Sequence, residues 1–355
     1  MTDPTSLTVF VTGATGFVGA HVVNQLALRG HRVRALVRPA SSATALAPAE
    51  ATGRLDLVRA DLSRVEPLTE GMQDCDVVIH LAAVKAGDFF SRFAGTVIGT
   101  ENLLAAATAA GVPRLVAIST FSVYDFGARP AKSLLDESFP VIADPVGRDE
   151  YAETKLYQDE LYRRFADVEG HTMVMLRPGM IYGPDQLWHP LLGGEFGPIE
   201  LKIGFTGRPP ITYVENTAEA IVLAAERLAD PATEAEVDDQ IINLVDDDLP
   251  TQRDYAAKLE GRTATPSAVP VPYPLMRAAA ATMAVLNRRL FEGRAKLPSL
   301  ALPDQVDARF KPFRYTNAKA KQLLGWSPRF TLDEALERSI AVERGESPAP
   351  IGATA

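Results

Sequence analysis

The sequence predicts an α/β fold, a doubly wound parallel sheet with a smaller C-terminal substrate lobe. Apolar runs of strand length alternate with stretches of helical spacing from Leu7 to Val245. A glycine-rich turn separates the first run from the first helical stretch. Beyond Pro250 the alternation stops, which indicates a separate lobe. The 355 residues, 46% of them apolar, suffice for one large domain and a smaller one.

Leu7–Val11 reads as the first strand, and the turn Thr12–Gly19 leads from it into a helix. Gly13, Gly16 and Gly19 recur at intervals of three. Glycines let the main chain approach a pyrophosphate, whose charge then faces a helix N-terminus. A strand, a glycine turn and a helix in this order predict a Rossmann-type dinucleotide site. An ordinary tight turn before a helix is the alternative.

Arg32–Val37 reads as the second strand, so Arg38 stands at its end. An NAD site usually offers a carboxylate here to the ribose 2′-hydroxyl, and Arg38 cannot accept that hydrogen bond. A guanidinium pairs well with a 2′-phosphate, which favours NADP(H) while NAD(H) remains possible. Alternatively, Arg38 is a solvated arginine at a strand end.

Leu55–Ala60 is expected to be the third strand, followed by Asp61-Leu62. Asp61 either accepts from an adenine amino group or caps the next turn. Asp76–Leu81 reads as the fourth strand, and the small Ala82 and Ala83 after it let a flat cofactor lie close to the backbone.

Thr96–Ala110 is predicted to be helical, with Asn102 in a structural hydrogen bond. Arg114–Ser119 reads as the fifth strand, and the hydroxyl-bearing segment from Thr120 to Tyr124 follows it. Side chains at the carboxyl ends of parallel strands face the crevice where ligands bind. These hydroxyls are therefore candidates for the site.

The helix expected over Asp149–Ala166 carries Tyr151 and Lys155, which lie one turn apart on one face. A nearby ammonium favours the phenolate and lowers the pKa of a tyrosine. Such a tyrosine can exchange a proton with an alcohol oxygen. Alone, the pair is weak evidence, and an ordinary surface helix explains it better. The glycine turn and the hydroxyl segment make the chemical interpretation preferable.

The later elements follow the same logic. A sixth strand is expected at His171–Leu176, a Pro/Gly-rich loop at Arg177–Pro184, an excursion that covers the substrate at Asp185–Pro210, a helix at Thr212–Leu228, a strand at Gln240–Val245, a helix at Pro250–Gly261, a linker or lobe connector at Thr263–Pro274, and helices at Leu275–Phe291, Lys319–Leu324 and Thr331–Arg344. We interpret Leu275–Phe291 as a lobe helix, with a membrane-surface helix as the alternative.

These elements divide the chain into a dinucleotide-binding domain (1–184 and 211–249), a substrate-binding lobe (185–210 and 250–344) and a mobile tail (345–355). The net charge of −9 argues against a nucleic-acid or anionic-membrane partner. The single cysteine, Cys75, excludes an intramolecular disulfide and a cysteine zinc cluster, and no metal is expected. Without a basic, apolar start, the chain is expected to be cytoplasmic.

Together these motifs resemble the extended short-chain dehydrogenase/reductase superfamily, of the NAD-dependent epimerase/dehydratase type. The resemblance rests on Thr12–Gly19, His80-Leu81-Ala82-Ala83, Thr120–Tyr124, Tyr151/Lys155, Arg177–Pro184 and Leu324-Gly325-Trp326-Ser327-Pro328, in that order. It covers nearly the whole chain and identifies no substrate.

The resemblance implies catalytic roles for three residues. Tyr151 would be the acid/base, Lys155 would hold the nicotinamide ribose and lower the tyrosine pKa, and the Thr120 hydroxyl would bind the reacting oxygen, with Ser119 and Ser122 as rivals. The cofactor-binding residues would be Gly13, Thr15, Gly16, Phe17, Val18, Arg38, Asp61, Leu62, Leu81, Ala82, Ala83, Tyr151, Lys155, Pro178, Gly179 and Ile181. A homodimer is implied as well.

Two positions depart from the sugar-nucleotide members. Phe121-Ser122 stands where the 4,6-dehydratases carry an Asp-Glu pair, and Gly179 stands where sugar-nucleotide enzymes often have Asn. The Arg38 position and the Pro-rich segment around Val269–Leu302 look more like the 3β-hydroxysteroid dehydrogenase and dihydroflavonol reductase branch. The leading hypothesis is therefore an NAD(P)-dependent oxidoreductase that interconverts a carbonyl and a secondary alcohol. An NDP-sugar epimerase with tightly bound NAD is the alternative, and a non-catalytic NADP sensor is the third.

Overall fold

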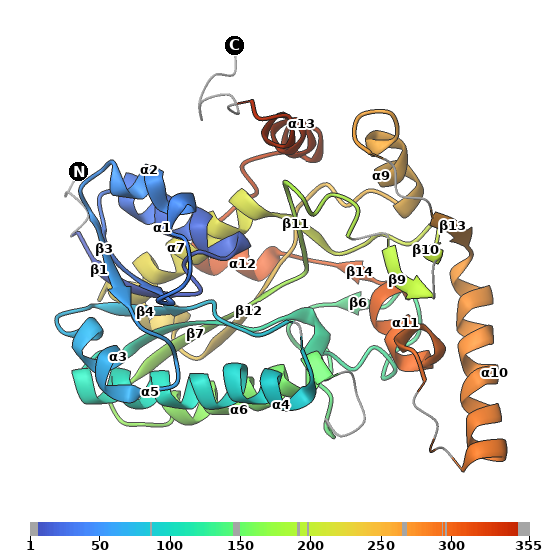
Figure 1. The fold of residues 1–355 in the computed structure, drawn as a ribbon, viewed down its shortest axis with the longest axis horizontal. Coiled ribbons are helices and arrows are strands. Elements are labelled where there is room, and N and C mark those ends of the chain that lie inside the picture. Colours follow the sequence, from blue (N-terminus) through green and yellow to red (C-terminus); the bar gives the residue numbers. More distant parts are fainter. Residues whose placement is uncertain are drawn as a thin grey trace.

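A computed structural model describes residues 6–85, 87–144, 150–189, 192–196, 199–264, 268–292, 294 and 297–346. Its centre is a seven-stranded sheet in which every neighbouring pair is parallel (Figure 1). In spatial order the strands are β12 (Gln240–Leu244), β7 (Thr172–Pro178), β5 (Arg114–Ile118), β4 (Val77–His80), β1 (Thr8–Thr12), β2 (Arg32–Val37) and β3 (Leu55–Arg59). The order reverses at β1, so the chain winds outward in both directions from a switch point between β1 and β4. The predicted α/β fold is confirmed.

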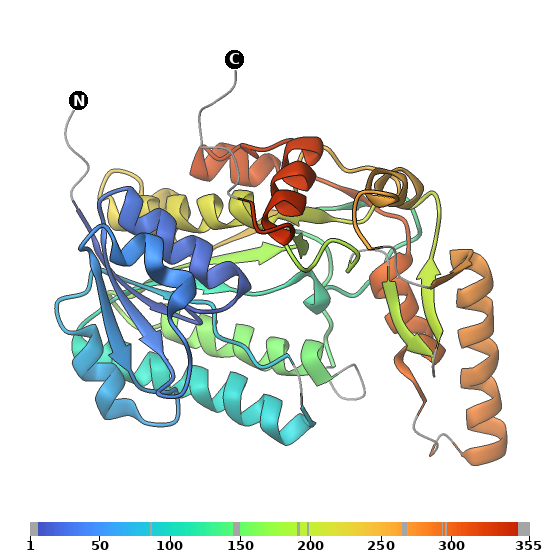
Figure 2. The ribbon, with the colours of Figure 1, turned by 45° about the horizontal axis from the view of Figure 1, so that its top comes forward.

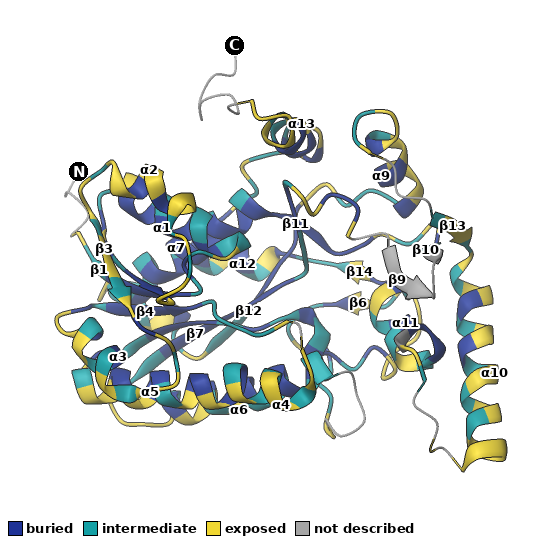
Figure 3. Cartoon of the chain, in the orientation of Figure 1, coloured by how far each residue is buried: buried dark blue, intermediate teal, exposed yellow. Residues whose placement is uncertain are grey.

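Helices cover both faces of this sheet, as Figures 1 and 2 show. One layer contains α3 (Val65–Met72), α5 (Gly99–Ala110) and α6 (Glu150–Ala166), and the other contains α1 (Phe17–Leu28), α7 (Val214–Ala229) and α12 (Ala318–Leu324). Successive strand residues point to opposite faces. Thus Val9 and Val11 belong to the core under α1 and α7, whereas Phe10 belongs to the core under α3 and α5. Each face of the sheet is therefore buried in its own apolar core (Figure 3).

Smaller elements extend the loops at the edges of the sheet. They are the 3₁₀ turns η1 (Thr44–Leu46) and η3 (Phe121–Val123), the π-helical segment η2 (Phe93–Ile98), the short helices α2 (Ala47–Glu50), α4 (Phe89–Arg92) and α8 (Glu234–Val237), and the strand pairs β6 (Leu134–Leu135) with β14 (Arg314–Tyr315) and β8 (Met180–Tyr182) with β11 (Ile211–Tyr213).

A second, three-stranded sheet supports the lobe, with β10 between β13 and β9. These strands are β9 (Leu192–Phe196), β10 (Ile199–Ile203) and β13 (Ala268–Val271), and the helical elements of this part are α9 (Gln252–Leu259), α10 (Tyr273–Phe291), η4 (Ser299–Ala301) and α11 (Pro303–Phe310). Ile203, Met276, Val306 and Phe310 are buried together as the local core.

The strands of the lobe differ from the sequence-based expectation. The stretch 185–210, for which no strand was expected, contains β9 and β10, and the expected linker 263–274 contains β13. The reason is that β10 pairs in parallel with β13 in the register Glu200 to Ala268, which are 68 residues apart in the chain. A local pattern rich in Gly and Pro cannot reveal a partner so distant in the sequence.

The C-terminal elements return to the main sheet. Trp326, which follows α12, is buried in the core under α1 and α7, and its Nε1–H donates to the carbonyl of Asn216 (3.0 Å). The last helix, α13 (Leu332–Glu343), begins with a capping box formed by Thr331 and Glu334. The two expected C-terminal helices are thus present. Residues 347–355 of the expected mobile tail, and 145–149 before α6, lie outside the described residues.

Candidate active site

The glycine turn lies at the switch point of the sheet, against the residues that follow β4. Gly13 has φ +65°, and a Cβ there would stand 2.9 Å from the amide nitrogen of Ala82. A Cβ on Gly19 would come within 2.0 Å of the Gly13 carbonyl oxygen. Both positions therefore admit only glycine in this backbone.

No side chain caps the first turn of α1, because its N-cap residue is Gly16. The uncapped backbone N–H groups of a helix N-terminus bind phosphate. Thr15, Phe17 and Val18, all half-buried, flank this turn. The backbone cradle and its uncapped amides fit the pyrophosphate of a dinucleotide.

A buried polar chain joins the glycine turn to the strand beside it. Thr12 Oγ1 hydrogen-bonds His80 Nδ1 (2.6 Å) and accepts from the N–H of Ala82 (3.3 Å). The other ring nitrogen, His80 Nε2, hydrogen-bonds Thr100 Oγ1 on α5 (2.9 Å). Burial, aided by the charge of Lys155, lowers the pKa of His80 to about 3, so the imidazole is neutral. This chain fixes the carboxyl ends of β1 and β4 relative to α5.

Lys155 is the buried cation of the site. Its ammonium donates to the carbonyl of Ile118 at the end of β5 (2.7 Å) and to Gln158 Oε1. Burial lowers the pKa of Lys155 to about 8, an effect that the carboxylate of Asp159 opposes and the ammonium of Lys85 reinforces. Tyr151 lies one turn earlier on α6 and is half-buried. The helix thus presents a half-buried phenol beside a fixed, buried ammonium.

The hydroxyls after β5 divide into two roles. Ser119 is buried, and its hydroxyl donates to Asp159 Oδ2 (2.8 Å). Ser119, a rival of Thr120 for binding the reacting oxygen, is therefore engaged inside the protein. Thr120 is half-buried, and its Oγ1 accepts from the N–H of Ser122 (3.2 Å) and donates to the Ser122 hydroxyl (3.3 Å). Tyr124 is fully buried and donates to Asn243 Oδ1 (2.8 Å). Thr120 and Ser122 are the hydroxyls available at the crevice.

A buried ion pair beneath these residues was not anticipated. Arg177, with no exposed surface, donates through Nη2 to Asp159 Oδ2 (3.1 Å), and its guanidinium lies 5.0 Å from the ring centroid of Tyr124. Asp159 therefore ties β7 and the end of β5 to α6. Gln158 and Asp159 follow Lys155 at i+3 and i+4, so helical spacing could have identified both.

The loop after β7 closes the same edge of the sheet. A Cβ on Gly179 would lie 2.0 Å from the Pro210 carbonyl oxygen, so this backbone leaves no room for an Asn side chain. The neighbouring Pro178 ends β7, and Ile181 pairs with Thr212 in the β8–β11 ladder. A Cβ on Gly183 would meet the ring of Phe17 at 3.0 Å. The loop thus contacts the start of α1, on the face of the sheet opposite α6.

Arg38 follows β2 and is exposed, and its carbonyl accepts from the N–H of Ser41 (2.9 Å). Arg59, which the sequence did not single out, is the last residue of β3, and its guanidinium donates to the Ser41 carbonyl (2.9 Å). Two arginines therefore border the turn after β2.

The residues after β3 are engaged within the protein. Asp61 Oδ1 accepts from the hydroxyl of Ser63 and from its N–H (2.9 Å for the N–H). These two hydrogen bonds lower the pKa of Asp61. This is the turn-capping geometry that was considered for Asp61. The Leu62 carbonyl accepts from Asn102 (2.8 Å), which gives Asn102 the structural role expected of it. Leu81, Ala82 and Ala83 are half-buried after β4, next to the glycine turn.

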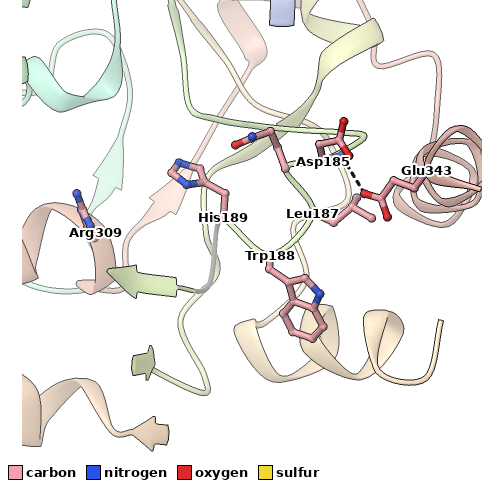
Figure 4. A pocket seen from close by; sticks show the side chains of 7 residues that line it. Asp185, Leu187, Trp188, His189, Arg309 and Glu343 are labelled. Carbon is pink, nitrogen blue, oxygen red and sulfur yellow. Dashed lines mark hydrogen bonds between the residues drawn. The ribbon is translucent and has the colours of Figure 1, made fainter. Parts of the chain in front are cut away.

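A cavity of about 490 Å³ lies between the 185–189 loop, α11 and α13 (Figure 4). Glu343 accepts from the N–H of Asp185 at one end (2.9 Å), and His189 and Arg309 lie at the other. Burial lowers the pKa of His189, and the charges of Arg309 and Lys85 lower it further. Lys85 lowers the pKa of Lys155 as well.

A family model described as NAD dependent epimerase/dehydratase family matches residues 9–238. The chain belongs to this family. A ketoreductase of Stigmatella aurantiaca, named for 4-hydroxy-2-methyl-3-oxo-4-farnesyl-3,4-dihydroquinoline-1-oxide, is 32% identical over 337 residues, which are 92% of this chain and 94% of the relative. A 3beta-hydroxysteroid-dehydrogenase/decarboxylase of Arabidopsis thaliana is 28% identical over 93% of this chain and 78% of its own. The resemblance to the epimerase/dehydratase type, near the hydroxysteroid branch, is confirmed.

The fold of this family member also matches solved structures. The UDP-glucuronic acid 4-epimerase from Bacillus cereus, in complex with UDP-glucuronic acid and NAD, aligns with a TM-score of 0.68 at 22% identity, covering 96% of this chain and 99% of the epimerase. Similarity at this level supports the Rossmann-type fold alone. The chain is thus an enzyme-family member whose relatives include dehydrogenases, reductases and epimerases.

Proposed function

We propose that this protein is an NAD(P)-dependent dehydrogenase or reductase that interconverts a carbonyl and a secondary alcohol. The observation that carries the proposal is the ammonium of Lys155, buried against the carbonyl of Ile118 and one helical turn from Tyr151. A buried cation is costly, and perturbed charges of this kind concentrate at functional sites. The Lys155 ammonium lies at the carboxyl ends of the strands, which is the edge of the sheet that also holds the glycine turn.

Residues of the chain would hold the cofactor along this edge. The amides of the Gly13–Val18 turn would bind the pyrophosphate, Ala82 and Ala83 would flank the ring system, and Pro178, Gly179 and Ile181 would bracket the nicotinamide. When bound, the nicotinamide supplies and accepts the hydride. Two arginines, Arg38 and Arg59, border the expected ribose position, which supports NADP(H) over NAD(H).

The protein side of the reaction is a proton transfer. In reduction, the Tyr151 hydroxyl would give its proton to the carbonyl oxygen, and in oxidation the phenolate would take it back. The Lys155 ammonium would stabilise that phenolate, and the Thr120 hydroxyl would donate a hydrogen bond to the same substrate oxygen. Lys155 is held in place by two hydrogen bonds, so little reorganisation accompanies the step.

The proposed substrate is an apolar ring ketone or alcohol, bound by the lobe of residues 185–210 and 250–344. Support comes from two relatives whose names contain a farnesylated quinoline oxide and a hydroxysteroid. Leu187 and Trp188 line the cavity between the 185–189 loop, α11 and α13. We also propose a cytoplasmic homodimer that binds no nucleic acid, consistent with the net charge of −9.

A panel of ketones assayed by NADPH and NADH oxidation tests this proposal. Turnover of an apolar ketone with freely exchanging NADPH would support it. The alternative is an NDP-sugar epimerase, whose fold is shared. Tightly retained NAD together with conversion of a UDP-sugar would overturn the reductase in favour of that alternative. The absence of a side chain at Gly179, where such enzymes often carry Asn, speaks against it.

A further inference from the structure

Helix α10 is the most exposed long helix of the lobe and lies along its outer edge, away from the main sheet (Figures 1 and 3). One side of the helix is anchored: Met276 and Ala280 are buried against α11 and β10. Arg277, on the same side, pairs with Asp307 (2.8 Å). These contacts fix which face of α10 points outward.

The outward face is apolar rather than polar. Leu275, Ala279, Met283, Leu286 and Leu290 follow one another at intervals of three or four residues, so they form one stripe. Leu275 is 62% exposed and Leu290 is 69% exposed, and Val285 and Phe291 add further exposed apolar surface. A solvent-facing helix normally carries polar residues on this side. A contiguous exposed apolar stripe marks an interaction surface.

The charges on α10 indicate what this surface contacts. The helix contains no carboxylate, and its last turn carries Arg288 and Arg289, both exposed. The chain as a whole has a net charge of −9, so this end of the lobe is a local exception. A second copy of this chain would also cover the stripe, but such a contact does not require two adjacent cations on the helix. Arg289 lies beside the stripe, three residues after Leu286, and Arg288 points to the opposite side of the helix. An apolar stripe on a helix whose charged residues are arginines matches an anionic lipid surface.

We propose that α10 is an interfacial helix that places the lobe on anionic lipid, with Leu286 and Leu290 inserted and Arg289 at the headgroups. This replaces the expectation, drawn from net charge alone, that an anionic membrane is no partner. Within the described residues, α10 and every other helix lack the combination of length and hydropathy needed to cross a bilayer. The contact is therefore made at the surface. It does not depend on the proposed reaction.

The test is co-sedimentation of the full chain with two kinds of vesicle. One contains phosphatidylcholine alone, and the other contains phosphatidylcholine with phosphatidylglycerol. We expect binding to the anionic vesicles that weakens as salt is added. Leu286→Glu or Leu290→Glu should reduce that binding about tenfold or more, because a leucine inserted into lipid is replaced by a charge. Arg289→Ser should reduce it about fivefold, on anionic vesicles only, and Arg288→Ser should have a smaller effect because Arg288 points away from the inserted leucines.

Matched variants elsewhere on the surface serve as controls. Leu28→Glu changes a leucine on α1 whose exposure (65%) is close to that of Leu290 (69%), and Arg164→Ser removes an exposed arginine of α6. Both should leave vesicle binding unchanged. Equal binding of Leu28→Glu and Leu286→Glu would overturn the proposal. So would an ultracentrifuge result in which the wild type is dimeric and ignores vesicles while Leu286→Glu is monomeric, since α10 would then contact a second copy.

Discussion

The two ends of the molecule are organised by different kinds of contact. At the end with the glycine turn, called here the dinucleotide end, the close contacts are between backbone atoms. Gly13 lies against Ala82, Gly19 against Gly13, and Gly179 against Pro210. In the lobe, single side chains hold distant segments together, as when the Tyr255 hydroxyl of α9 donates to the Leu187 carbonyl (2.6 Å). Backbone contacts tolerate almost no substitution, whereas side-chain contacts can be exchanged. The first end is therefore suited to a constant cofactor and the second to a variable substrate.

The largest effect is expected at the buried lysine. Lys155→Met should lower kcat about a thousandfold, because the phenolate loses its stabilising charge. Arg164→Met, an exposed cation on the same helix, is the control and should leave kcat unchanged. In the wild type, the folded pKa of about 8 means that the ammonium is present below that pH and lost above it. Activity should therefore fall as the pH rises through about 8, and a profile that is flat to pH 10 would contradict the assigned role.

The backbone character of the dinucleotide end can be tested at Gly19. Gly19→Ala places a methyl group 2.0 Å from a carbonyl oxygen and should cost about 3 kcal/mol of unfolding free energy, with loss of dinucleotide binding. Gly30→Ala is the comparison, because Gly30 has φ +96° but no atom within 4 Å of its Cβ position. Gly30→Ala should lower the free energy of unfolding and leave dinucleotide binding unchanged. Calorimetry measures the stability of both variants, and titration measures their dinucleotide binding. Unchanged binding in Gly19→Ala would contradict a turn that admits only glycine.

Much of the dinucleotide end could be predicted from sequence because its signals are local. Strand periodicity, glycine spacing and the Tyr151/Lys155 interval each reside within one short stretch. The doubly wound parallel sheet followed from the alternation of strands and helices. Gln158, Asp159 and Arg59 were missed, although the first two follow Lys155 at helical spacing. Their function comes from contacts with β5, β7 and the turn after β2, which no local pattern contains.

The lobe was less predictable for a physical reason. The strand β13 exists because β10, far earlier in the chain, pairs with it. The sequence predicted α10 as a helix but not which of its faces is exposed. In the structure Met276 and Ala280 occupy the buried side, which leaves the apolar stripe exposed. Folding determines which face of such a helix is free.

A smaller effect is expected at Arg38, which bears on the choice of cofactor. Arg38→Ser should weaken NADPH binding about thirtyfold, the value of a lost charged hydrogen bond, and leave NADH binding unchanged. Arg54→Ser is a control, because Arg54 is an exposed arginine that donates to the Gly30 carbonyl instead. Fluorescence titration with both dinucleotides measures the ratio. Equal loss for NADPH and NADH would contradict a 2′-phosphate contact.

The smallest effect is expected in the lobe. Tyr255→Phe removes the hydrogen bond to Leu187 and should cost about 1 kcal/mol of unfolding free energy. Because Leu187 lines the cavity, KM for the ketone should rise while the affinity for NADPH stays constant. Steady-state kinetics measure KM for the ketone, and a separate titration measures the affinity for NADPH. A change in cofactor affinity instead would mean that the two ends are not independent.

The most direct test of the assigned chemistry is Tyr151→Phe, which removes one hydroxyl from the first turn of α6. We expect kcat to fall at least about a hundredfold, because the proton donor is lost, while the NADPH dissociation constant changes less than about twofold. Both quantities should be measured on the same preparation, by stopped-flow turnover and by fluorescence titration. Turnover equal to that of the wild type, with NADPH bound as before, would contradict the role of Tyr151 as the acid/base.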